Sequence, residues 1–302
     1  MRYRVEYVLF RCAFAFIAAL PFRTALRLGA CIGTLLYFGH KRGRQIGLIN
    51  LAIAFPERSA ADRRRILRAS CRNIGRVIAE FCHLPQLDAE RLAELVHFAD
   101  RPAWDRAIQR AGEVGAVIVT AHFGNWELLA YAHGLLGHPI TLVHRPMRNP
   151  LFDRAIADIR GRAGTRSIPK KAAAREALRT LKQQGILVVP SDQNQTLSYG
   201  VFVDFFGKPA CTTPGAARLA MLTGAVVYPV FLVREREREH HRLELLEPIE
   251  MVATGDREAD IRANTQRCVN VIEDMIRLYP EQWIWFHKRW KTQPPGVPRP
   301  YR

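Results

Sequence analysis

The spacing of apolar and polar positions divides the chain into a helical first part and a strand–helix second part. Residues 5–22 and 25–38 are mostly apolar, and Glu6 and Arg11 interrupt the first of these stretches. Over 57–83 the apolar residues recur at helical spacing beside a face rich in Arg, which predicts an amphipathic helix. That face suits either plain solvation or contact with a membrane or an acidic partner. We therefore expect about the first 80 residues to form a helical appendage.

After residue 110 short apolar runs alternate with helical patterns. Thr212 is a candidate cap for one of these helices, and Pro214 suits its first turn. Strands are expected over 114–120, 140–144, 186–190, 226–233 and 242–246, and helices over 125–136, 151–162, 172–184, 213–223 and 256–278. Uniformly apolar strands alternating with helices predict an α/β fold, with a mixed, mainly parallel sheet flanked by helices.

Charge is concentrated near the start of the chain. The 302 residues carry a formal net charge of +17, and residues 1–80 hold 15 Lys or Arg against four Asp or Glu. The composition excludes a disordered, collagenous or low-complexity protein. A basic first quarter implies an anionic partner, which is a phospholipid surface, a nucleic acid or an acidic protein. Because no nucleic-acid-binding module is recognisable, we expect no nucleic acid partner.

The apolar N-terminus has three interpretations: a membrane-inserted or interfacial helix, an ordinary core helix, or a secretory signal. The signal is disfavoured because Arg11 lies within the apolar region and no A-x-A site follows it. We favour a membrane segment over 1–39 and one catalytic or binding domain over 40–302. If the segment spans the bilayer, the cations at 41–44 place the body of the protein on the cytoplasmic side.

Common catalytic and metal-binding motifs are missing. The chain contains no GxGxxG, GxxxxGK[ST], HExxH or GxSxG pattern, and its six Cys are far apart with no CxxC pair. A four-letter SxxK match at 167–170 lacks its companion motifs and is discarded. We expect reduced thiols and no metal site.

One constellation points to chemistry, the sequence AHFGNWE over 121–127. It follows the strongest predicted strand and opens a helix, which is where α/β proteins place reactive groups. His122 is a candidate general base, Glu127 could reach back to its imidazole and fix the tautomer, and Gly124 permits a tight turn. A purely structural strand-to-helix cap is the alternative.

These residues resemble the H-x4-D/E block of glycerolipid and lipid A acyltransferases. The fuller pattern is similar to the late lipid A acyltransferases, the lauroyl/myristoyl family of Gram-negative bacteria. The FPEGTR block of the glycerol-phosphate branch is missing. The other matching blocks, in chain order, are HRP at 144–146 with NPL at 149–151, SDQN at 191–194, VDFFGKP at 203–209 with TTPG at 212–215, and PEQW at 280–283 continuing to Lys291.

The resemblance implies an inner-membrane O-acyltransferase with its catalytic domain on the cytoplasmic face. His122 is then the catalytic base with Glu127 as its partner, so that a His–Glu dyad deprotonates the hydroxyl of a hydroxyacyl chain on a lipid A precursor. The acyl donor is the thioester of acyl carrier protein, with no other cofactor and no metal. The expected partners are acyl carrier protein, the lipid A precursor and the phospholipid membrane. The expected substrate-binding residues are Arg160, Asp192, Asn125, Arg145 and Arg162.

Two alternatives stay open at this stage. The enzyme could use acyl-CoA, or another glycolipid, phospholipid or aminolipid acceptor, or the chain could be a non-catalytic basic membrane-binding protein. Aromatics interleaved with cations over 283–291 suit either a headgroup interface or a final core helix. His287 within that stretch is not counted as catalytic.

Overall fold

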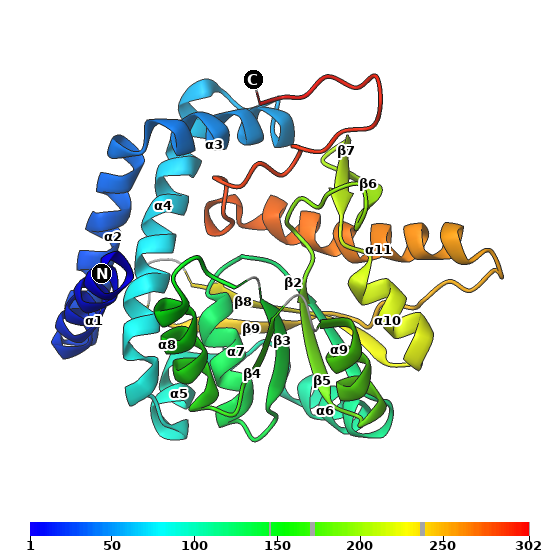
Figure 1. Ribbon diagram of the computed structural model, residues 1–302, viewed down its shortest axis with the longest axis horizontal. Helices are drawn as coiled ribbons and strands as arrows, with labels where there is room; N and C mark the ends of the chain where they lie inside the picture. Colours follow the sequence, from blue (N-terminus) through cyan, green and yellow to red (C-terminus); the bar gives the residue numbers. More distant parts are fainter. Residues whose placement is uncertain (145, 170–172, 236–238, 302) are drawn as a thin grey trace.

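In the computed structural model, a mainly parallel sheet is covered by helices on both faces, and the four N-terminal helices lie along one flank and across the top of the view in Figure 1. The structure describes residues 1–144, 146–169, 173–235 and 239–301. The N-terminal helices are α1 (Arg2–Ala19), α2 (Phe22–Gly39), α3 (Lys41–Ala54) and α4 (Ala60–His83). The helical appendage predicted from periodicity is therefore present.

The seven strands of the sheet run in the order β1-β9-β8-β2-β5-β3-β4. They are β1 (Val96–Phe98), β2 (Ala116–Thr120), β3 (Ile140–His144), β4 (Arg166–Pro169), β5 (Ile186–Pro190), β8 (Val226–Arg234) and β9 (His241–Leu245). Strands β8, β2, β5, β3 and β4 are parallel, and β9 is antiparallel to β8. The sheet confirms the predicted α/β class.

Alternate residues of the buried strands enter two separate cores. In β2, Val117 and Val119 face the core that contains α10 (Gly215–Thr223), α11 (Arg257–Leu278) and the C-terminal tryptophans. Ala116 and Ile118 face the core beneath α6 (Arg101–Val114) and α7 (Trp126–Leu135). The helices and turns around the sheet are η1 (Leu84–Gln86), α5 (Ala89–Leu95), α6 (Arg101–Val114), α7 (Trp126–Leu135), α8 (Pro150–Gly161), α9 (Ala173–Lys182), α10 (Gly215–Thr223), α11 (Arg257–Leu278) and η3 (Pro280–Gln282).

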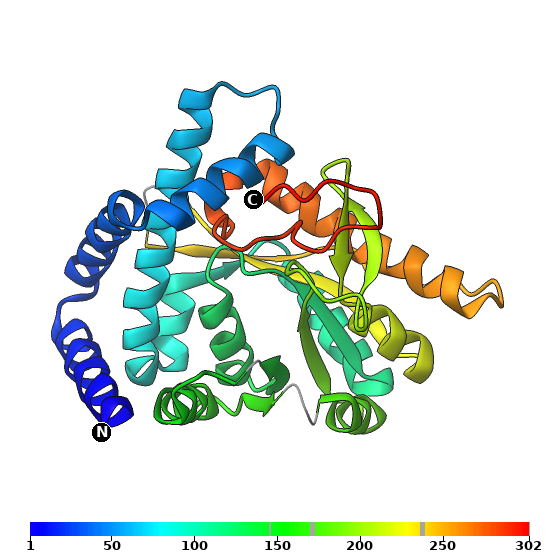
Figure 2. The same ribbon diagram turned by 45° about the horizontal axis from the view of Figure 1, so that its top comes forward.

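Helix α2 lies against α4 at backbone contact distance. A Cβ added to Gly29 would meet the carbonyl oxygen of Gly75 at 2.3 Å, and one added to Gly33 would meet that of Cys71 at 2.1 Å. Figure 2 shows α1 and α2 following one another along the flank, outside α4. Among the described helices, none combines the length and the apolar character needed to cross a bilayer.

A hairpin, β6 (Val201–Phe205) and β7 (Lys208–Thr212), stands apart from the main sheet and was not predicted. Its two-residue turn holds Phe206 at φ 54° and Gly207 at φ 68°, as a twisted hairpin requires. The expected cap role of Thr212 is wrong, because this residue ends β7 and its hydroxyl donates to the carbonyl of Ala210. Instead, the hydroxyl of Thr213 accepts from the Gly215 N–H at the start of α10.

The C-terminal aromatic stretch is a buried core segment. Trp283, Trp285 and Trp290 are at most 1% exposed, and Arg289 is 0% exposed. The headgroup-interface interpretation is therefore wrong for these residues. They also do not form the final helix that was the alternative, since only the 3-10 turn η3 precedes a non-helical path through the core. The six Cys are free thiols, of which Cys12 and Cys31 are exposed.

Candidate active site

The carboxyl ends of β2 and β5 bring His122 and Asp192 together. The two strands are paired in parallel with Thr120 opposite Pro190, so the residues that follow them emerge side by side. The Nδ1 of His122 lies 2.9 Å from the Oδ1 of Asp192. The Oδ2 of the same carboxylate accepts from the His122 backbone N–H at 3.1 Å and from the Trp283 Nε1–H at 2.9 Å. Asp192 is thereby held by three donors.

This pairing sets the protonation of both groups. Burial by itself lowers the pKa of His122, but the charge and hydrogen bond of Asp192 outweigh it, and the pKa is raised. Burial would raise the pKa of Asp192, yet His122 and the Trp283 donor lower it to about 2. Asp192 is therefore ionised at neutral pH and accepts the proton on Nδ1. The neutral imidazole then carries its free lone pair on Nε2, as a general base needs.

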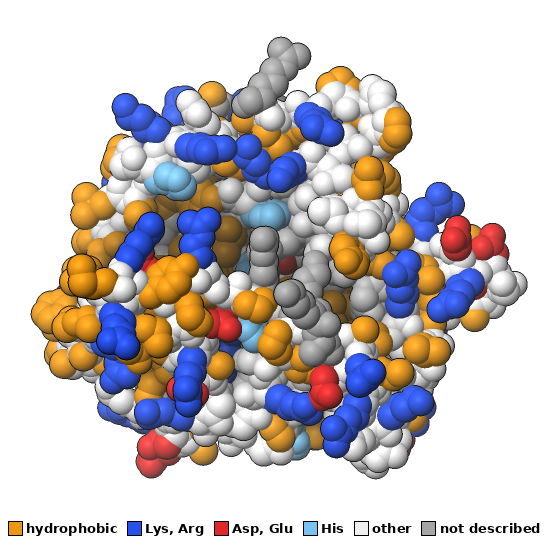
Figure 3. Space-filling model, viewed as in Figure 1, with side chains coloured by type: hydrophobic (Ala, Val, Ile, Leu, Met, Phe, Trp, Pro, Cys, Tyr) orange, Lys and Arg blue, Asp and Glu red, His pale blue; other side chains and the backbone are white. Residues whose placement is uncertain are grey.

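The outer side of the imidazole remains accessible. The His122 side chain is 28% exposed, whereas that of Asp192 is 2% exposed. The Gln193 amide nitrogen lies 3.3 Å from both ring nitrogens, within hydrogen-bond distance of each. The Trp126 ring lies 5.6 Å from the imidazole. Figure 3 shows a hollow near the middle of this face, with His side chains on its wall and Lys or Arg on its rim.

Glu127 does not hydrogen-bond to His122, in contrast to the expectation from the sequence. Its two carboxylate oxygens instead accept from Arg160, at 2.9 Å from Nε and 2.6 Å from one terminal nitrogen. Both side chains are about 15% exposed. Helix geometry explains the difference, because Glu127 lies in the first turn of α7 on the side that faces α8. Glu127 acts on His122 through its charge, which raises the pKa of the imidazole.

The loop between β2 and α7 is held by close backbone contacts. Gly124 has φ 57°, and a Cβ there would lie 1.8 Å from the carbonyl oxygen of Leu232. The Gly124 N–H donates to the carbonyl of Gln282, and its own carbonyl accepts from the Asn73 side chain at 3.1 Å. The position of His122 therefore depends on a glycine that no other residue can replace without displacing β8.

A buried charge network lies beneath this loop. Glu80 of α4 accepts from Asn125 at 2.7 Å, from two nitrogens of Arg234 at 2.8 and 2.5 Å, and is bonded to His241 at 2.9 Å. Arg234 also donates to Asn73 at 2.8 Å. Burial opposes ionisation of Glu80, but the adjacent Arg234 and His241 hold its pKa far below the usual value. The network connects α4 and β8 to the loop that carries His122.

Comparison with known proteins gives the family. Residues 2–292 match the family described as bacterial lipid A biosynthesis acyltransferase. The chain belongs to this family. It is 29% identical to the lipid A biosynthesis lauroyltransferase of Escherichia coli K12, over 94% of this chain and 91% of that protein. It is 27% identical to the lipid A biosynthesis palmitoleoyltransferase of the same organism, over 92% of this chain and 88% of that protein. It is 26% identical to the lipid A biosynthesis myristoyltransferase of that organism, over 91% of this chain and 82% of that protein.

Within this acyltransferase, the other expected substrate-binding residues lie in different settings. Asn125 is 0% exposed, and its side chain caps α7 at Leu128 while donating to Glu80. Arg162 is exposed where α8 ends. Arg145 lies outside the described residues.

His287 was not selected from the sequence, yet it adjoins the site. Its Nε2 accepts from the Asn194 N–H at 2.9 Å, two residues after Asp192. Burial lowers its pKa to about 4, so the ring is neutral at physiological pH. Two carbonyls of the same segment, those of Trp285 and His287, accept from Asn50 of α3. The only sequence signal was the aromatic stretch around it, which a core assignment explained equally well.

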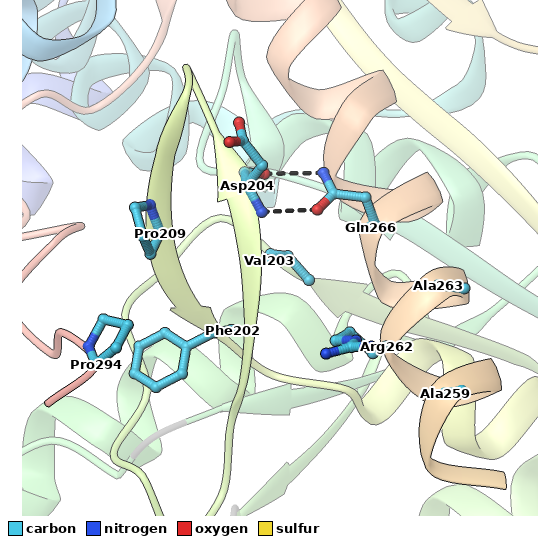
Figure 4. Close-up of a pocket in the computed structure, with 9 residues that line it drawn as sticks. All are labelled: Phe202, Val203, Asp204, Pro209, Ala259, Arg262, Ala263, Gln266 and Pro294. Carbon is cyan, nitrogen blue, oxygen red and sulfur yellow. Dashed lines mark hydrogen bonds between the residues drawn. The ribbon is translucent and has the colours of Figure 1, made fainter. Parts of the chain in front are cut away.

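No cluster of three or more His, Cys, Asp or Glu suited to a metal ion occurs within the described ranges. A groove of about 600 Å³ lies between the β6–β7 hairpin and α11, and Figure 4 shows its lining. There Gln266 both donates to and accepts from the backbone of Asp204. This groove shares no residue with the His122 site.

Proposed function

We propose that this acyltransferase moves a fatty acyl chain from acyl carrier protein to the hydroxyl of a hydroxyacyl chain on a lipid A precursor. The proposed location is the cytoplasmic face of the inner membrane. The observation that supports it most directly is the partly exposed His122 imidazole backed by the buried Asp192 carboxylate. The named activities of the three relatives support lipid A as the source of the acceptor.

In the proposed mechanism, Asp192 fixes the tautomer and His122 Nε2 accepts the proton of the acceptor hydroxyl. The alkoxide oxygen attacks the thioester carbonyl carbon and forms a tetrahedral intermediate. The intermediate then expels the thiolate of the carrier's phosphopantetheine arm, which takes the proton from the imidazolium. The new ester and the free thiol leave, and His122 returns to its neutral form.

Asp192 replaces Glu127 as the direct partner of the base in this proposal. Glu127 of α7 and Arg160 of α8 lie near enough to the imidazole for their charges to act on it. Their opposite charges act on His122 in opposite directions, because Glu127 raises its pKa and Arg160 lowers it. With the pair intact, Asp192 is the main charge that raises the pKa of His122 against the effect of burial. An anionic substrate group that engaged Arg160 would leave Glu127 free to favour the imidazolium.

A reconstituted assay tests the proposal. Purified protein is mixed with a radiolabelled acyl–acyl carrier protein and a hydroxyacylated lipid A precursor, and in parallel with acyl-CoA. His122→Ala should lower turnover by about 10²- to 10⁴-fold. The matched control is His97→Ala, since His97 is a surface histidine with its own carboxylate partner, Glu235. Normal turnover in His122→Ala would reject the base assignment.

The acceptor is tested separately by mass spectrometry of lipid A from a strain that lacks the protein. We expect lipid A that lacks one secondary acyl chain, restored by the wild type and not by His122→Ala. Unchanged lipid A together with an altered phospholipid or aminolipid profile would reassign the acceptor. Faster reaction with acyl-CoA than with acyl carrier protein would reassign the donor.

A further inference from the structure

A groove lined by arginines lies between the end of α2 and the first half of α4. It has a volume of about 460 Å³, with Tyr37 and Phe38 of α2 on one side. The opposite side is formed by α4 residues, of which Arg64, Arg65, Arg68 and Arg72 are all exposed. Three of them, Arg64, Arg68 and Arg72, follow a four-residue spacing, so their side chains lie in one row along the helix.

The positive charge of this row is not neutralised within the chain. Arg65 pairs with Asp62 at 2.8 Å. Among the described residues, no carboxylate lies within salt-bridge distance of Arg64, Arg68 or Arg72. The Arg68 guanidinium lies 5.6 Å from the Phe38 ring centre, which orients it without reducing its charge. Closely spaced cations of this kind repel one another unless an anion lies between them.

An apolar face adjoins the groove. Because glycines hold α2 close against α4, the other side of α2 faces outward. Exposed there are Ile32, Leu35, Leu36 and Phe38, at 38%, 70%, 50% and 56%. Helix α1 continues this face, with no buried residue of its own. Figure 3 shows hydrophobic side chains gathered along the flank formed by α1 and α2.

An apolar face beside a row of cations is the chemical profile of a segment that lies in a membrane interface. The apolar residues suit the acyl boundary, and the guanidiniums suit the phosphate layer immediately above it. An acidic protein would match the cations but would leave several large apolar side chains in water.

We propose that the groove formed by Arg64, Arg68 and Arg72 with Phe38 binds the phosphate of an anionic phospholipid headgroup in the membrane. The exposed apolar sides of α1 and α2 insert beside it. Arginine suits this role because its planar donors grip a phosphate in two places. The inference is independent of the acyl-transfer chemistry, since none of these residues contacts the His122 site.

Vesicle co-sedimentation of the full-length protein tests the proposal. Vesicles of phosphatidylglycerol with phosphatidylcholine are compared with vesicles of phosphatidylcholine alone. The triple variant Arg64→Gln/Arg68→Gln/Arg72→Gln should lose on the order of 100-fold in affinity for the anionic vesicles. Its affinity for neutral vesicles should stay within about threefold. Raising the salt concentration should weaken the wild type more than the variant.

The matched control removes the same charge elsewhere. Arg101, Arg106 and Arg110 are exposed on α6, and their triple Gln variant should bind anionic vesicles within about threefold of the wild type. A Leu35→Ser/Leu36→Ser variant should lose affinity for both vesicle types. Thermal unfolding of the arginine variant should be unchanged, and so should its turnover on detergent-dispersed substrate. Because vesicle binding is measured without turnover, a failure of the proposed catalysis would leave the binding result intact.

Three outcomes would overturn the proposal. Equal losses in the α4 and α6 variants would mean that only net charge matters. Retention of vesicle affinity in the α4 variant, with loss of binding to acyl carrier protein, would assign the groove to an acidic protein. If millimolar inorganic phosphate displaced the protein from vesicles, and the wild type showed no preference for anionic over neutral vesicles, the groove would be assigned to a soluble anion.

Discussion

At the scale of single residues, the Asp192 carboxylate determines how His122 can react. Asp192→Asn preserves the side-chain shape but removes the charge, and its single amide oxygen cannot accept from both the His122 Nδ1–H and the Trp283 Nε1–H, which bond to different carboxylate oxygens. We expect kcat to fall by about 10²- to 10³-fold. The acidic limb of kcat/KM against pH should move to lower pH, because the carboxylate no longer raises the pKa of His122. An unmoved limb measured with the reconstituted assay would contradict the assignment.

The Glu127–Arg160 contact is also a residue-scale prediction, because each side chain is largely buried and depends on the other. Arg160→Met should lower the free energy of unfolding by about 3 kcal/mol, since it leaves a carboxylate without its partner. Adding Glu127→Gln should restore at least about 1 kcal/mol of that loss. Urea denaturation of the two single variants and the double variant measures the coupling. Additive losses would show that the pair does not form in solution.

The residues of the site differ in how far sequence could predict them. His122 followed from its place after a strongly apolar strand. Asp192 was selected through family resemblance, but its contact with His122 depends on β5 inserting between β2 and β3, which local patterns do not report. Glu127 was assigned to the wrong partner because five residues of separation did not reveal which side of α7 it occupies. Arg160 contacts it from α8, 33 residues further on.

At the scale of elements, the β2–α7 loop is held by a close backbone contact at Gly124. Gly124→Ala would place a methyl group against the Leu232 carbonyl of β8 and strain a positive φ. We expect loss of turnover by at least tenfold, together with destabilisation of about 2 kcal/mol or more. Steady-state kinetics and urea denaturation on the same preparation measure both effects.

Gly112→Ala in α6 is the matched control for that substitution. Its added Cβ meets no atom within 4 Å, and alanine favours the helix. This variant should keep full turnover and gain roughly 0.5 to 1 kcal/mol in stability. Equal behaviour of the two variants would mean that the loop geometry is not needed for catalysis.

Elements with strong periodicity were predicted to within a few residues, and elements set by tertiary contacts were not. The strands at 140–144 and 186–190 match the sequence pattern, because uniformly apolar runs are typical of buried parallel strands. The β6–β7 hairpin was missed because Phe206 occupies a left-handed position that usually signals itself by Asn or Gly. The burial of the tryptophans could not be decided from sequence, because their flanking cations suit an interface as well as a core, and the structure shows Arg289 itself buried against Phe205.

At the scale of the whole molecule, acid stability depends on histidines that stay neutral when folded. His133 of α7 is buried against Trp104, neither ring nitrogen has a hydrogen-bond partner, and burial lowers its pKa to about 3. Between pH 6.5 and pH 3 the unfolded chain binds this proton and the folded chain does not. Stability from this residue alone therefore falls by about 1.4 kcal/mol per pH unit as the pH decreases.

His133→Leu removes that proton uptake with little change in volume. The loss of unfolding free energy between pH 7.5 and pH 5 should be about 2 kcal/mol smaller in the variant than in the wild type. Urea titrations at the two pH values measure the difference. His287, with a pKa of about 4, should retain its own share of the slope in both proteins. An identical pH dependence would show that His133 is protonated or hydrated in the fold.

Helix α4 has a consequence for how the enzyme meets its substrates. One continuous helix carries the row of Arg64, Arg68 and Arg72 near its start and Glu80 near its end. Arg68, at the centre of the row, precedes Glu80 by about 12 residues, or roughly 18 Å along the helix axis. In the proposed attachment, a rigid connection of this kind would keep the reaction centre at a constant distance from the lipid surface, with no conformational change needed in between. Attachment then confines the search for a lipid acceptor to two dimensions and raises its effective concentration. Vesicle binding should accordingly lower the apparent KM for the acceptor while kcat remains that of the detached enzyme.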